Sequence, residues 1–251
     1  MKIVVIGGTG LIGSQVVNLL QNTGHDVVVA SPNTGVNTLT GEGLSAALQN
    51  AQVVVDVSNS PSFEDGPVMD FFKTSNQNLL PAEKTAGVQH HVALSVVGTK
   101  ELQASGYFRA KQVQEDMIKA SGIPYTIVHA TQFFEFAGGI LQMSITDGKV
   151  VVPDANIQPI ASKDVAFFVA QTAVAKPVNT IIEIGGPEKF PMDTWIKQYA
   201  QATHKNYEIS ADAKALYSGA PLEADTITPK KAVYLGPTKY ADWIAIPQNQ
   251  R

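Results

Sequence analysis

Short runs of apolar, often β-branched residues recur along the chain as far as residue 185, and longer segments with helical apolar spacing separate them. The short runs predict strands at Ile3–Ile6, Val27–Ala30, Val53–Val57, Val92–Val96, Tyr125–Ala130 and Thr180–Ile184. The longer segments predict helices at about residues 11–23, 42–50, 67–86, 105–120 and 162–174. Strands that are apolar along most of their length are typical of a parallel sheet covered on both faces. The alternation therefore predicts an α/β fold with a doubly wound, mostly parallel sheet.

The pattern loosens after Gly185-Gly186-Pro187. It then predicts one helix at 192–203 and a short strand at Tyr207–Ser210, followed by a tail that contains Pro, Ala and Lys. We expect a sheet domain at residues 1–186 and a small C-terminal substrate-binding lobe at residues 187–251. An excursion at about residues 133–159 is expected to join that lobe.

Composition narrows the classes of partner and compartment. The 251 residues carry 18 Lys and Arg against 22 Asp and Glu, a net charge of −4, and no Cys. This balance gives no electrostatic reason to expect a nucleic-acid partner. The absence of Cys excludes disulfides and thiolate nucleophiles and fits a reducing compartment. The N-terminal run Met1–Ile6 leads directly into glycines, so we expect neither a signal peptide nor a membrane span. We expect a cytoplasmic protein that is a monomer or a homodimer.

A glycine-rich turn directly follows the first predicted strand and opens a predicted helix. Glycines at positions 7 and 10 allow a tight turn and close approach of the backbone to a pyrophosphate, and Gly13 lets the helix pack close to the strand. The helix N-terminus adds unpaired N–H groups and a positive dipole. This context indicates a dinucleotide site, whose candidate residues are Gly7, Thr9, Gly10, Leu11, Ile12 and Gly13.

The end of the second strand bears on which nicotinamide cofactor is bound. An Asp or Glu at this place accepts a hydrogen bond from the adenosine ribose 2′-hydroxyl of NAD. Here the strand Val27–Ala30 leads into Ser31-Pro32-Asn33-Thr34-Gly35, which has no carboxylate. Ser31, Asn33 and Thr34 can instead donate to a 2′-phosphate. We therefore expect NADP, with NAD as the alternative.

Tyr107 and Lys111 stand four residues apart near the start of the predicted 105–120 helix, so their side chains share one face. An ammonium near a phenol favours phenolate, and a tyrosine so tuned serves as a proton donor or acceptor. Ser95 lies at the carboxyl end of the Val92–Val96 strand, where open α/β sheets bind ligands, and can hydrogen-bond a substrate oxygen. We predict these three as the catalytic residues. The alternative is a surface tyrosine beside a solvated lysine.

Several other side chains are candidates for lining the same cleft. His129 and Glu135 suggest an acid–base pair, although hydrogen-bonded lining is the commoner role of such residues. His90 and His91 are adjacent on a strand and point to opposite faces, so we expect no metal site. Phenylalanines cluster near the expected cleft and suggest a flat, apolar or aromatic small-molecule substrate if several reach the pocket: Phe63, Phe71, Phe72, Phe108, Phe133, Phe134 and Phe136.

The glycine turn, the serine and the Tyr–Lys pair together resemble the short-chain dehydrogenase/reductase superfamily, a group with the Rossmann fold. The form Gly-x-Thr-Gly-x-x-Gly at Gly7–Gly13 is closer to its extended and atypical members than to the classical ones. Further stretches resemble the atypical NmrA-like, NAD(P)H-binding branch: Asn78-Leu79-Leu80, Gly87-Val88, His91-Val92-Ala93-Leu94-Ser95, Gly122-Ile123-Pro124-Tyr125-Thr126-Ile127-Val128 and Asp164-Val165-Ala166. The resemblance spans about residues 1–186.

The resemblance implies an NAD(P)-binding Rossmann domain and assigns roles to the candidates. In the superfamily the serine orients a carbonyl, the tyrosine transfers the proton, and the lysine binds the nicotinamide ribose while tuning the tyrosine. These roles correspond to Ser95, Tyr107 and Lys111. Family position adds the following cofactor-lining residues: Ser58, Asn59 and, near the adenine, Asn37. Many NmrA-like proteins lack the tyrosine, which this chain keeps.

We therefore expect an NADP-dependent oxidoreductase that reduces a carbonyl or quinone-like apolar small molecule by hydride transfer. The sequence also fits two alternatives. The first is a non-catalytic NAD(P)-sensing regulatory protein, because some NmrA-like proteins only sense the cofactor. The second is a nucleotide-dependent epimerase or isomerase that uses the cofactor transiently.

Overall fold

The main sheet of the computed structural model has seven strands within residues 1–250, the part of the chain that the structure describes. Their order is β12-β9-β5-β4-β3-β1-β2. The pairings β1–β2, β1–β3, β3–β4 and β9–β12 are parallel. The strands are β1 (Lys2–Ile6), β2 (Asp26–Ala30), β3 (Val53–Asp56), β4 (His90–Val96), β5 (Tyr125–Ala130), β9 (Thr180–Gly185) and β12 (Ala232–Leu235). The predicted α/β fold with a doubly wound, mostly parallel sheet is confirmed.

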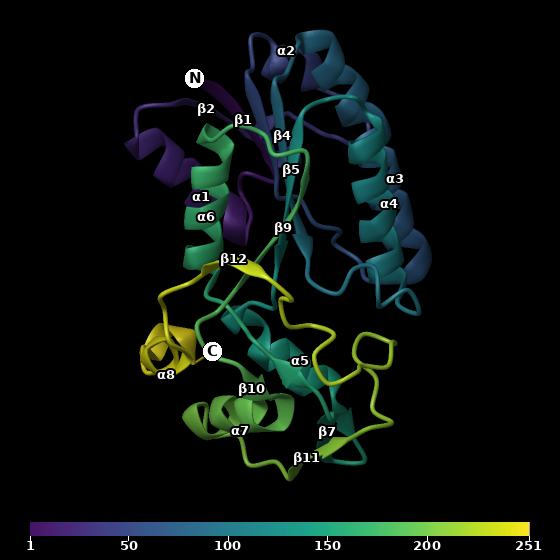
Figure 1. The fold of residues 1–251 in the computed structure, drawn as a ribbon, viewed down its shortest axis with the longest axis vertical. Coiled ribbons are helices and arrows are strands. Elements are labelled where there is room, and N and C mark those ends of the chain that lie inside the picture. The colour runs from purple at the N-terminus through teal and green to yellow at the C-terminus, as the bar shows by residue number, and fades with distance from the viewer. Residues whose placement is uncertain (251) are drawn as a thin grey trace. The chain divides into compact units, whose positions relative to one another are not determined.

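The order of the first three strands creates a switch point beside β1. Strands β2 and β3 flank β1 on its two sides, since Val4 pairs with Val28 on one side and with Val54 on the other. Helices α1 (Leu11–Asn22) and α6 (Ser162–Val174) cover one face of the sheet, and α3 (Asp65–Ala86) and α4 (Gly106–Ala120) cover the other (Figure 1). Open parallel sheets bind ligands outside the carboxyl ends of the strands at such a point.

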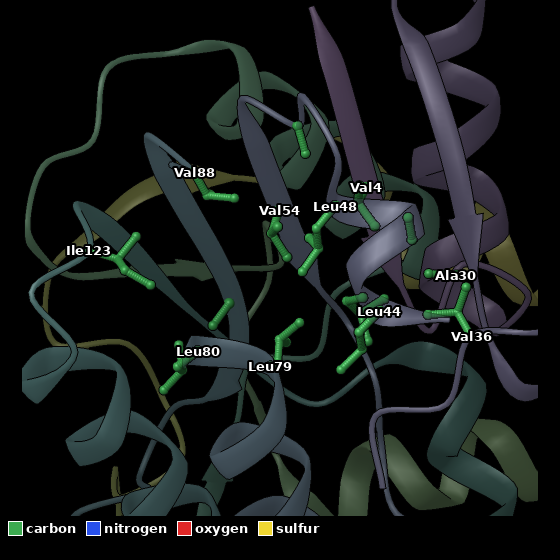
Figure 2. Packing of buried hydrophobic residues seen from close by; sticks show 14 of the residues in the cluster. Val4, Ala30, Val36, Leu44, Leu48, Val54, Leu79, Leu80, Val88 and Ile123 are labelled. Carbon is green, nitrogen blue, oxygen red and sulfur yellow. The ribbon is translucent and has the colours of Figure 1, made fainter. Parts of the chain in front are cut away.

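The core under α3 explains why these segments fold as they do. Alternation along β1 places Val4 and Ile6 on this face, while Ile3 and Val5, equally buried, point to the other. Leucines of α3 and of α2 (Leu44–Leu48) pack on the same face (Figure 2). Each fully buried aliphatic side chain of this kind stabilises the fold by roughly 1.5–3 kcal/mol.

Helix α2 is shorter than the predicted helix at 42–50. Gly41 and Gly43 both have positive φ angles, 80° and 72°, so the chain turns twice before the helix begins. A Cβ at Gly43 would lie 2.1 Å from the Gly35 carbonyl oxygen, so this close approach requires glycine. Asn50, also at positive φ, follows the end of the helix. Local backbone geometry therefore overrides the apolar spacing here.

The described chain divides into two compact units, each built from segments that alternate along the sequence. Unit 1 comprises Met1–Ser95, Gly106–His129 and Val165–Ile182; unit 2 comprises Val96–Ser105, Ala130–Asp164 and the chain from Glu183 onward. The assignment of a nucleotide-binding domain to residues 1–186 and of a substrate-binding lobe to residues 187–251 stays a prediction.

Unit 2 contains small sheets and an aromatic core. Strand β7 (Lys149–Pro153) pairs with β6 (Ile145–Thr146) and β11 (Ile209–Asp212), and β8 (Asn156–Ile157) pairs with β10 (Phe190–Pro191). The strand predicted at Tyr207–Ser210 lies two residues further along, because its pairing with β7 begins at Ile209 opposite Val150. Helices α5 (Ala137–Met143), α7 (Met192–Ala202) and α8 (Tyr240–Ile244) complete the unit. Its buried aromatic rings include Phe134, Trp195, Tyr240 and Trp243.

Among the helices described, the structure contains none with both the length and the apolar character needed to span a bilayer.

Candidate functional site

The turn after β1 and the loop after β3 meet so closely that only glycine fits. Gly7 has a φ of 76°, and a Cβ at this position would lie 2.8 Å from the Ser58 Cα. A Cβ at Gly13 would lie 2.1 Å from the Gly7 carbonyl oxygen. Unit 1 therefore holds the start of α1 directly against the switch point of the sheet, as the sequence pattern requires for a dinucleotide turn.

The N-terminus of α1 offers donors suited to an anion. The Gly10 N–H donates to the Gly7 carbonyl at 2.9 Å, and the Ser14 N–H donates to the Gly10 carbonyl at 3.0 Å. Within the described residues, no side chain caps this end and no acidic residue lies in its first turn. The N–H groups of Leu11, Ile12 and Gly13 precede the first intrahelical hydrogen bond, so they remain available together with the positive end of the helix dipole. This donor set fits the pyrophosphate of a dinucleotide.

Some of the polar groups in the loop after β2 form hydrogen bonds within the loop and to the end of the strand. Residues Pro32–Thr34 form a 3-10 turn in which the Ser31 N–H donates to Thr34 Oγ1 at 2.9 Å. The Thr34 hydroxyl donates in turn to the Val29 carbonyl at 2.8 Å. Of the three predicted donors to a 2′-phosphate, Ser31 is buried, whereas Thr34 and Asn33, which lies in the middle of this turn, are exposed. The segment brings no carboxylate to this place.

The other predicted cofactor-lining residues lie in two loops of unit 1. The Asn37 side chain accepts the Leu39 N–H at 2.9 Å within its own loop, and Asn59 is exposed just after β3. Ser58 donates its hydroxyl to Asp56 Oδ1 at 2.6 Å and its N–H to the same oxygen at 3.0 Å. Asp56 is therefore a buried anchor of the loop beside Gly7, a role that the sequence did not reveal.

Tyr107 lies in the first turn of α4 among aromatic rings. Its ring centroid is 5.5 Å from that of Phe63, 5.5 Å from that of Phe108 and 6.2 Å from that of Phe72. Tyr107 is half-buried, whereas Phe63 is 66% exposed. These ring contacts fix the phenol on one face of α4.

Lys111 is buried, which argues against the alternative of a surface tyrosine beside a solvated lysine. Its Nζ donates to the Leu94 carbonyl at 2.9 Å and to the Gln114 side chain, and it lies 4.5 Å from the centre of the Phe72 ring. Burial lowers the pKa of Lys111 to about 8, although Asp56 and Glu115 oppose the shift. Phe72 thus contacts both members of the Tyr107–Lys111 pair.

A polar chain connects Lys111 to the loop after β3. Gln114 accepts from Lys111 and donates its amide to Asp56 Oδ2 at 2.9 Å. Asp56 in turn holds the N–H and the hydroxyl of Ser58. The end of β3, the end of β4 and helix α4 are therefore joined through charged and amide groups at the place where the predicted site residues lie.

Ser95 is joined to two residues that the sequence did not link to it. Its hydroxyl donates to Glu115 Oε1 at 2.7 Å, and His129 Nε2 lies 2.7 Å from the same oxygen. Burial tends to raise the pKa of Glu115, but the bonds from His129 and Ser95 outweigh it and hold this pKa below its ordinary value. Because a carboxylate only accepts, the Ser95 proton points to Glu115, and the lone pairs of Ser95 Oγ remain for another donor.

The structure does not join His129 and Glu135 as an acid–base pair. Glu135 accepts the N–H and the hydroxyl of Ser162 in unit 2, while His129 pairs with Glu115 in unit 1. One sequence signal pointed to Glu115: Phe108, Lys111, Glu115 and Ile118 recur at helical spacing and are all buried. Charged residues that share a helix face with apolar ones indicate a buried polar cluster, since such groups enter a core only when paired.

The adjacent histidines of β4 point to opposite faces, as their spacing predicts. His91 Nδ1 lies 2.9 Å from both Glu83 carboxylate oxygens, and His90 Nε2 lies 2.9 Å from Thr126 Oγ1. Burial opposes the charged form of His91, but the Glu83 carboxylate outweighs it and raises the pKa of His91. Residues 1–250 contain no cluster of three or more His, Cys, Asp or Glu side chains placed to hold a metal ion.

Comparison with known proteins adds independent findings. A family described as NAD(P)H-binding matches residues 7–176. The Photosystem II assembly factor Ycf39 of Cyanophora paradoxa is 26% identical over 196 residues, 71% of this chain and 61% of that protein. The Ycf39 of Synechocystis is also 26% identical, over 67% of this chain and 57% of that protein. The matches therefore span less than two thirds of the length of these assembly factors.

An NAD(P)H azoreductase of Xenophilus azovorans is 28% identical over 204 residues, 74% of this chain and 68% of that protein. Among solved structures, MoeE5 in complex with UDP-glucose and NAD superposes with a TM-score of 0.73. The alignment covers 98% of this chain and 96% of that one at 16% identity, so this likeness shows the fold alone.

Substituting Gly13→Ala tests the glycine turn. The added Cβ collides with the Gly7 carbonyl, so we expect the turn to open and the affinity for NADPH to fall at least about tenfold. Titration followed by NADPH fluorescence measures this. Gly66→Ala in α3, where a Cβ meets nothing within 4 Å, is the matched control and should bind like the wild type. Wild-type affinity in Gly13→Ala would contradict the proposed geometry.

Because the Lys111 amine is buried and its pKa is lowered, we expect the free energy of unfolding to depend on pH. Between about pH 8 and pH 10 it is neutral in the folded chain but still protonated in the unfolded chain. The unfolded chain then binds more protons, so the contribution of Lys111 to the free energy of unfolding rises with pH by at most about 3 kcal/mol. Urea unfolding at several pH values measures the free energy of unfolding. That of the wild type should rise relative to that of Lys111→Met as the pH increases through this range. For the control Lys149→Met, at an exposed site, the difference in free energy of unfolding from the wild type should not depend on pH. A pH-independent difference for Lys111→Met would contradict the lowered pKa of Lys111.

Proposed function

Because this chain belongs to the NAD(P)H-binding family, we propose that it is an NADP-dependent oxidoreductase that reduces a carbonyl or quinone-like apolar small molecule. The observation that carries the proposal is the contact of Phe72 with both Tyr107 and the buried Lys111, in the same unit as the glycine turn at the sheet's switch point. A pair used only as surface residues would have no reason to bury its ammonium. The superfamily that the sequence resembles supplies the assignment of roles.

The proposed mechanism divides the work between cofactor and protein. A bound nicotinamide supplies the hydride. Tyr107 supplies a proton to the substrate oxygen, because a phenol hydroxyl is a hydrogen-bond donor that can act as a general acid. An ammonium has three donors, of which Lys111 uses one on Leu94 and one on Gln114. The remaining donor is assigned to the nicotinamide ribose hydroxyls.

Ser95 has a more restricted role in this proposal than the resemblance implies. Its proton is held by Glu115, so it presents an acceptor to the reacting group rather than a donor. An acceptor suits the hydroxyl of a reduced product or of Tyr107 better than a carbonyl oxygen. Polarisation of the substrate carbonyl therefore falls to Tyr107, and Glu115 with His129 acts by positioning Ser95.

NADP is proposed over NAD because the loop after β2 lacks an acidic group. A carboxylate there would repel a 2′-phosphate and accept from a 2′-hydroxyl. The turn Pro32–Thr34 instead places the uncharged, exposed Asn33 at its centre. Ser31 and Thr34 shape the turn, and Asn33 is the residue assigned to the phosphate.

A second candidate function is cofactor-dependent assembly or regulation without turnover. Two relatives carry the name of an assembly factor, although the matches span only 61% and 57% of their lengths. The engagement of Lys111 and Ser95 with other protein groups also suits a site that binds a cofactor and does not turn over. Tight NADPH binding without oxidation of NADPH by any quinone or aromatic carbonyl would favour this function.

Substituting Tyr107→Phe tests the reductase. The substitution keeps the aromatic ring that contacts Phe63, Phe72 and Phe108, so the fold should persist. Loss of the proton donor is expected to lower kcat by about 10²- to 10⁴-fold. The readout is NADPH oxidation at saturating concentrations of a panel of quinones and aromatic carbonyls.

Tyr125→Phe, at the start of β5 in the same unit, is the matched control and should keep wild-type kcat. If Tyr107→Phe turns over as fast as the wild type, the tyrosine has no part in the chemistry.

Substituting Asn33→Asp tests the choice of cofactor. A carboxylate at this exposed position should weaken NADPH binding about tenfold or more by repulsion and leave NADH binding equal or tighter. Calorimetric dissociation constants for both cofactors measure the effect, with Asn18→Asp at an exposed position of α1 as a control for added charge. Equal losses for NADPH and NADH in Asn33→Asp would place the 2′-phosphate elsewhere.

A further inference from the structure

Phe63 is an aromatic side chain at the surface of unit 1. It is 66% exposed, more than any other phenylalanine in residues 1–250. A single exposed apolar side chain is ordinary in a folded protein. This ring, however, contacts Tyr107, the residue proposed to supply the proton, at 5.5 Å between centroids. Its exposure therefore bears on what can bind beside that phenol.

Phe63 ends a row of three rings that begins at the buried Lys111. Phe72 is fully buried, and its ring centre lies 4.5 Å from the Lys111 Nζ. The Tyr107 ring, which is half-buried, lies 6.2 Å from that of Phe72 and forms an angle of 49° with that of Phe63. Exposure increases along this row from Phe72 to Phe63. The row therefore presents an aromatic surface to solvent next to Tyr107.

Local hydrogen bonds hold the loop that carries Phe63. The Ser62 N–H donates to Ser60 Oγ at 3.3 Å, and the Glu64 N–H donates to Ser62 Oγ at 3.2 Å. Hydroxyls that accept from the backbone two residues ahead form turns of this kind. The second bond spans Phe63, so the backbone on both sides of the ring is constrained.

Asp65 attaches the end of this loop to the start of α4. Arg109 donates to Asp65 Oδ2 at 2.5 Å. A Cβ at Gly106 would lie 1.9 Å from Asp65 Oδ1, so the glycine allows the carboxylate to lie directly against the helix. Asp65 follows Phe63 by two residues, and Gly106 directly precedes Tyr107. The contact between the two rings is therefore supported by backbone and charged groups on both elements.

We propose that Phe63 is a specificity-determining residue that stacks on the aromatic ring of an aryl carbonyl substrate whose oxygen is bound by Tyr107. This proposal rests on the proposed reductase function and narrows its substrate class to carbonyl groups conjugated with an aromatic ring. Paired aromatic rings attract each other beyond the burial of their area. A saturated ring of the same size gains the burial but not this attraction.

The role of Phe63 is confined to binding. An aryl ketone, NADPH and a proton give an aryl carbinol and NADP. The hydride forms the new C–H bond at the carbonyl carbon, the C–O π bond breaks, and the oxygen takes the proton of Tyr107, which regains one from solvent. Phe63 contacts none of the reacting atoms and binds the substrate ring before and during the transfer alike. Such uniform binding acts on KM more than on kcat.

The test compares acetophenone with cyclohexyl methyl ketone, which share the acetyl group and differ in whether the ring is aromatic. The preference for acetophenone is the ratio of the two kcat/KM values. In Phe63→Leu we expect this preference to fall about three- to tenfold, mainly through a higher KM for acetophenone. The KM for NADPH and the melting temperature should not change, because the replaced side chain is exposed.

Phe167→Leu is the matched control. Phe167 is also in unit 1 and 44% exposed, but it belongs to α6, which covers the other face of the sheet (Figure 1). This variant should keep the wild-type preference. A fall of the same size in Phe167→Leu would contradict the assignment to Phe63.

The outcomes separate this inference from the reductase function. An unchanged preference in Phe63→Leu, including an equal loss on both ketones, overturns the inference and leaves the reductase intact. If the wild type oxidises NADPH with no carbonyl and no quinone, the reductase proposal fails. Whenever the wild type reduces neither ketone, ligand-observed NMR of both ketones with NADPH-saturated protein decides the inference. A preference in binding for acetophenone that Phe63→Leu loses supports it, and an equal preference in both proteins or no binding overturns it.

Discussion

The closeness of two backbone segments is the constraint on which the candidate site depends. The turn after β1 touches the loop after β3, and the positions of Gly7 and Gly13 leave no room for a Cβ. The same closeness brings the start of α1, which no side chain caps, to the switch point of the sheet. A larger residue at either glycine would separate the start of this helix from the edge where parallel strands bind ligands. The position of the site in the sheet and the geometry of the turn therefore both depend on glycine at these two positions.

Polar groups inside unit 1 connect the loop after β3 to helix α4. Asp56 fixes the loop after β3 through Ser58 and reaches Lys111 through Gln114. Glu115 gathers Ser95 and His129 on the neighbouring strands. Buried charges are tolerated only when their hydrogen bonds are complete, so these connections leave each group little freedom to move. The side chains proposed for chemistry are consequently positioned before any ligand arrives.

The sequence predicted the repeating elements well because apolar periodicity is a local property. It identified β5 and α6 to the residue and the glycine turn in its correct context. It overextended α2, where left-handed glycines shorten the helix. Helical spacing marked Glu115 as a buried charged residue, but Ser95 and His129 bind it from two other elements, so the contacts themselves leave no local pattern. Position along the chain paired His129 with Glu135, and only the packing of α4 against the sheet revealed Glu115 as its partner.

Amide hydrogen exchange in the presence and absence of NADPH tests the central claim most directly, because it reports on the N–H groups that are assigned to the pyrophosphate. The account predicts that NADPH slows exchange at Leu11, Ile12 and Gly13 and leaves the N-terminal turn of α7, in unit 2, unchanged. Equal exchange at these three amides with and without saturating NADPH would contradict it.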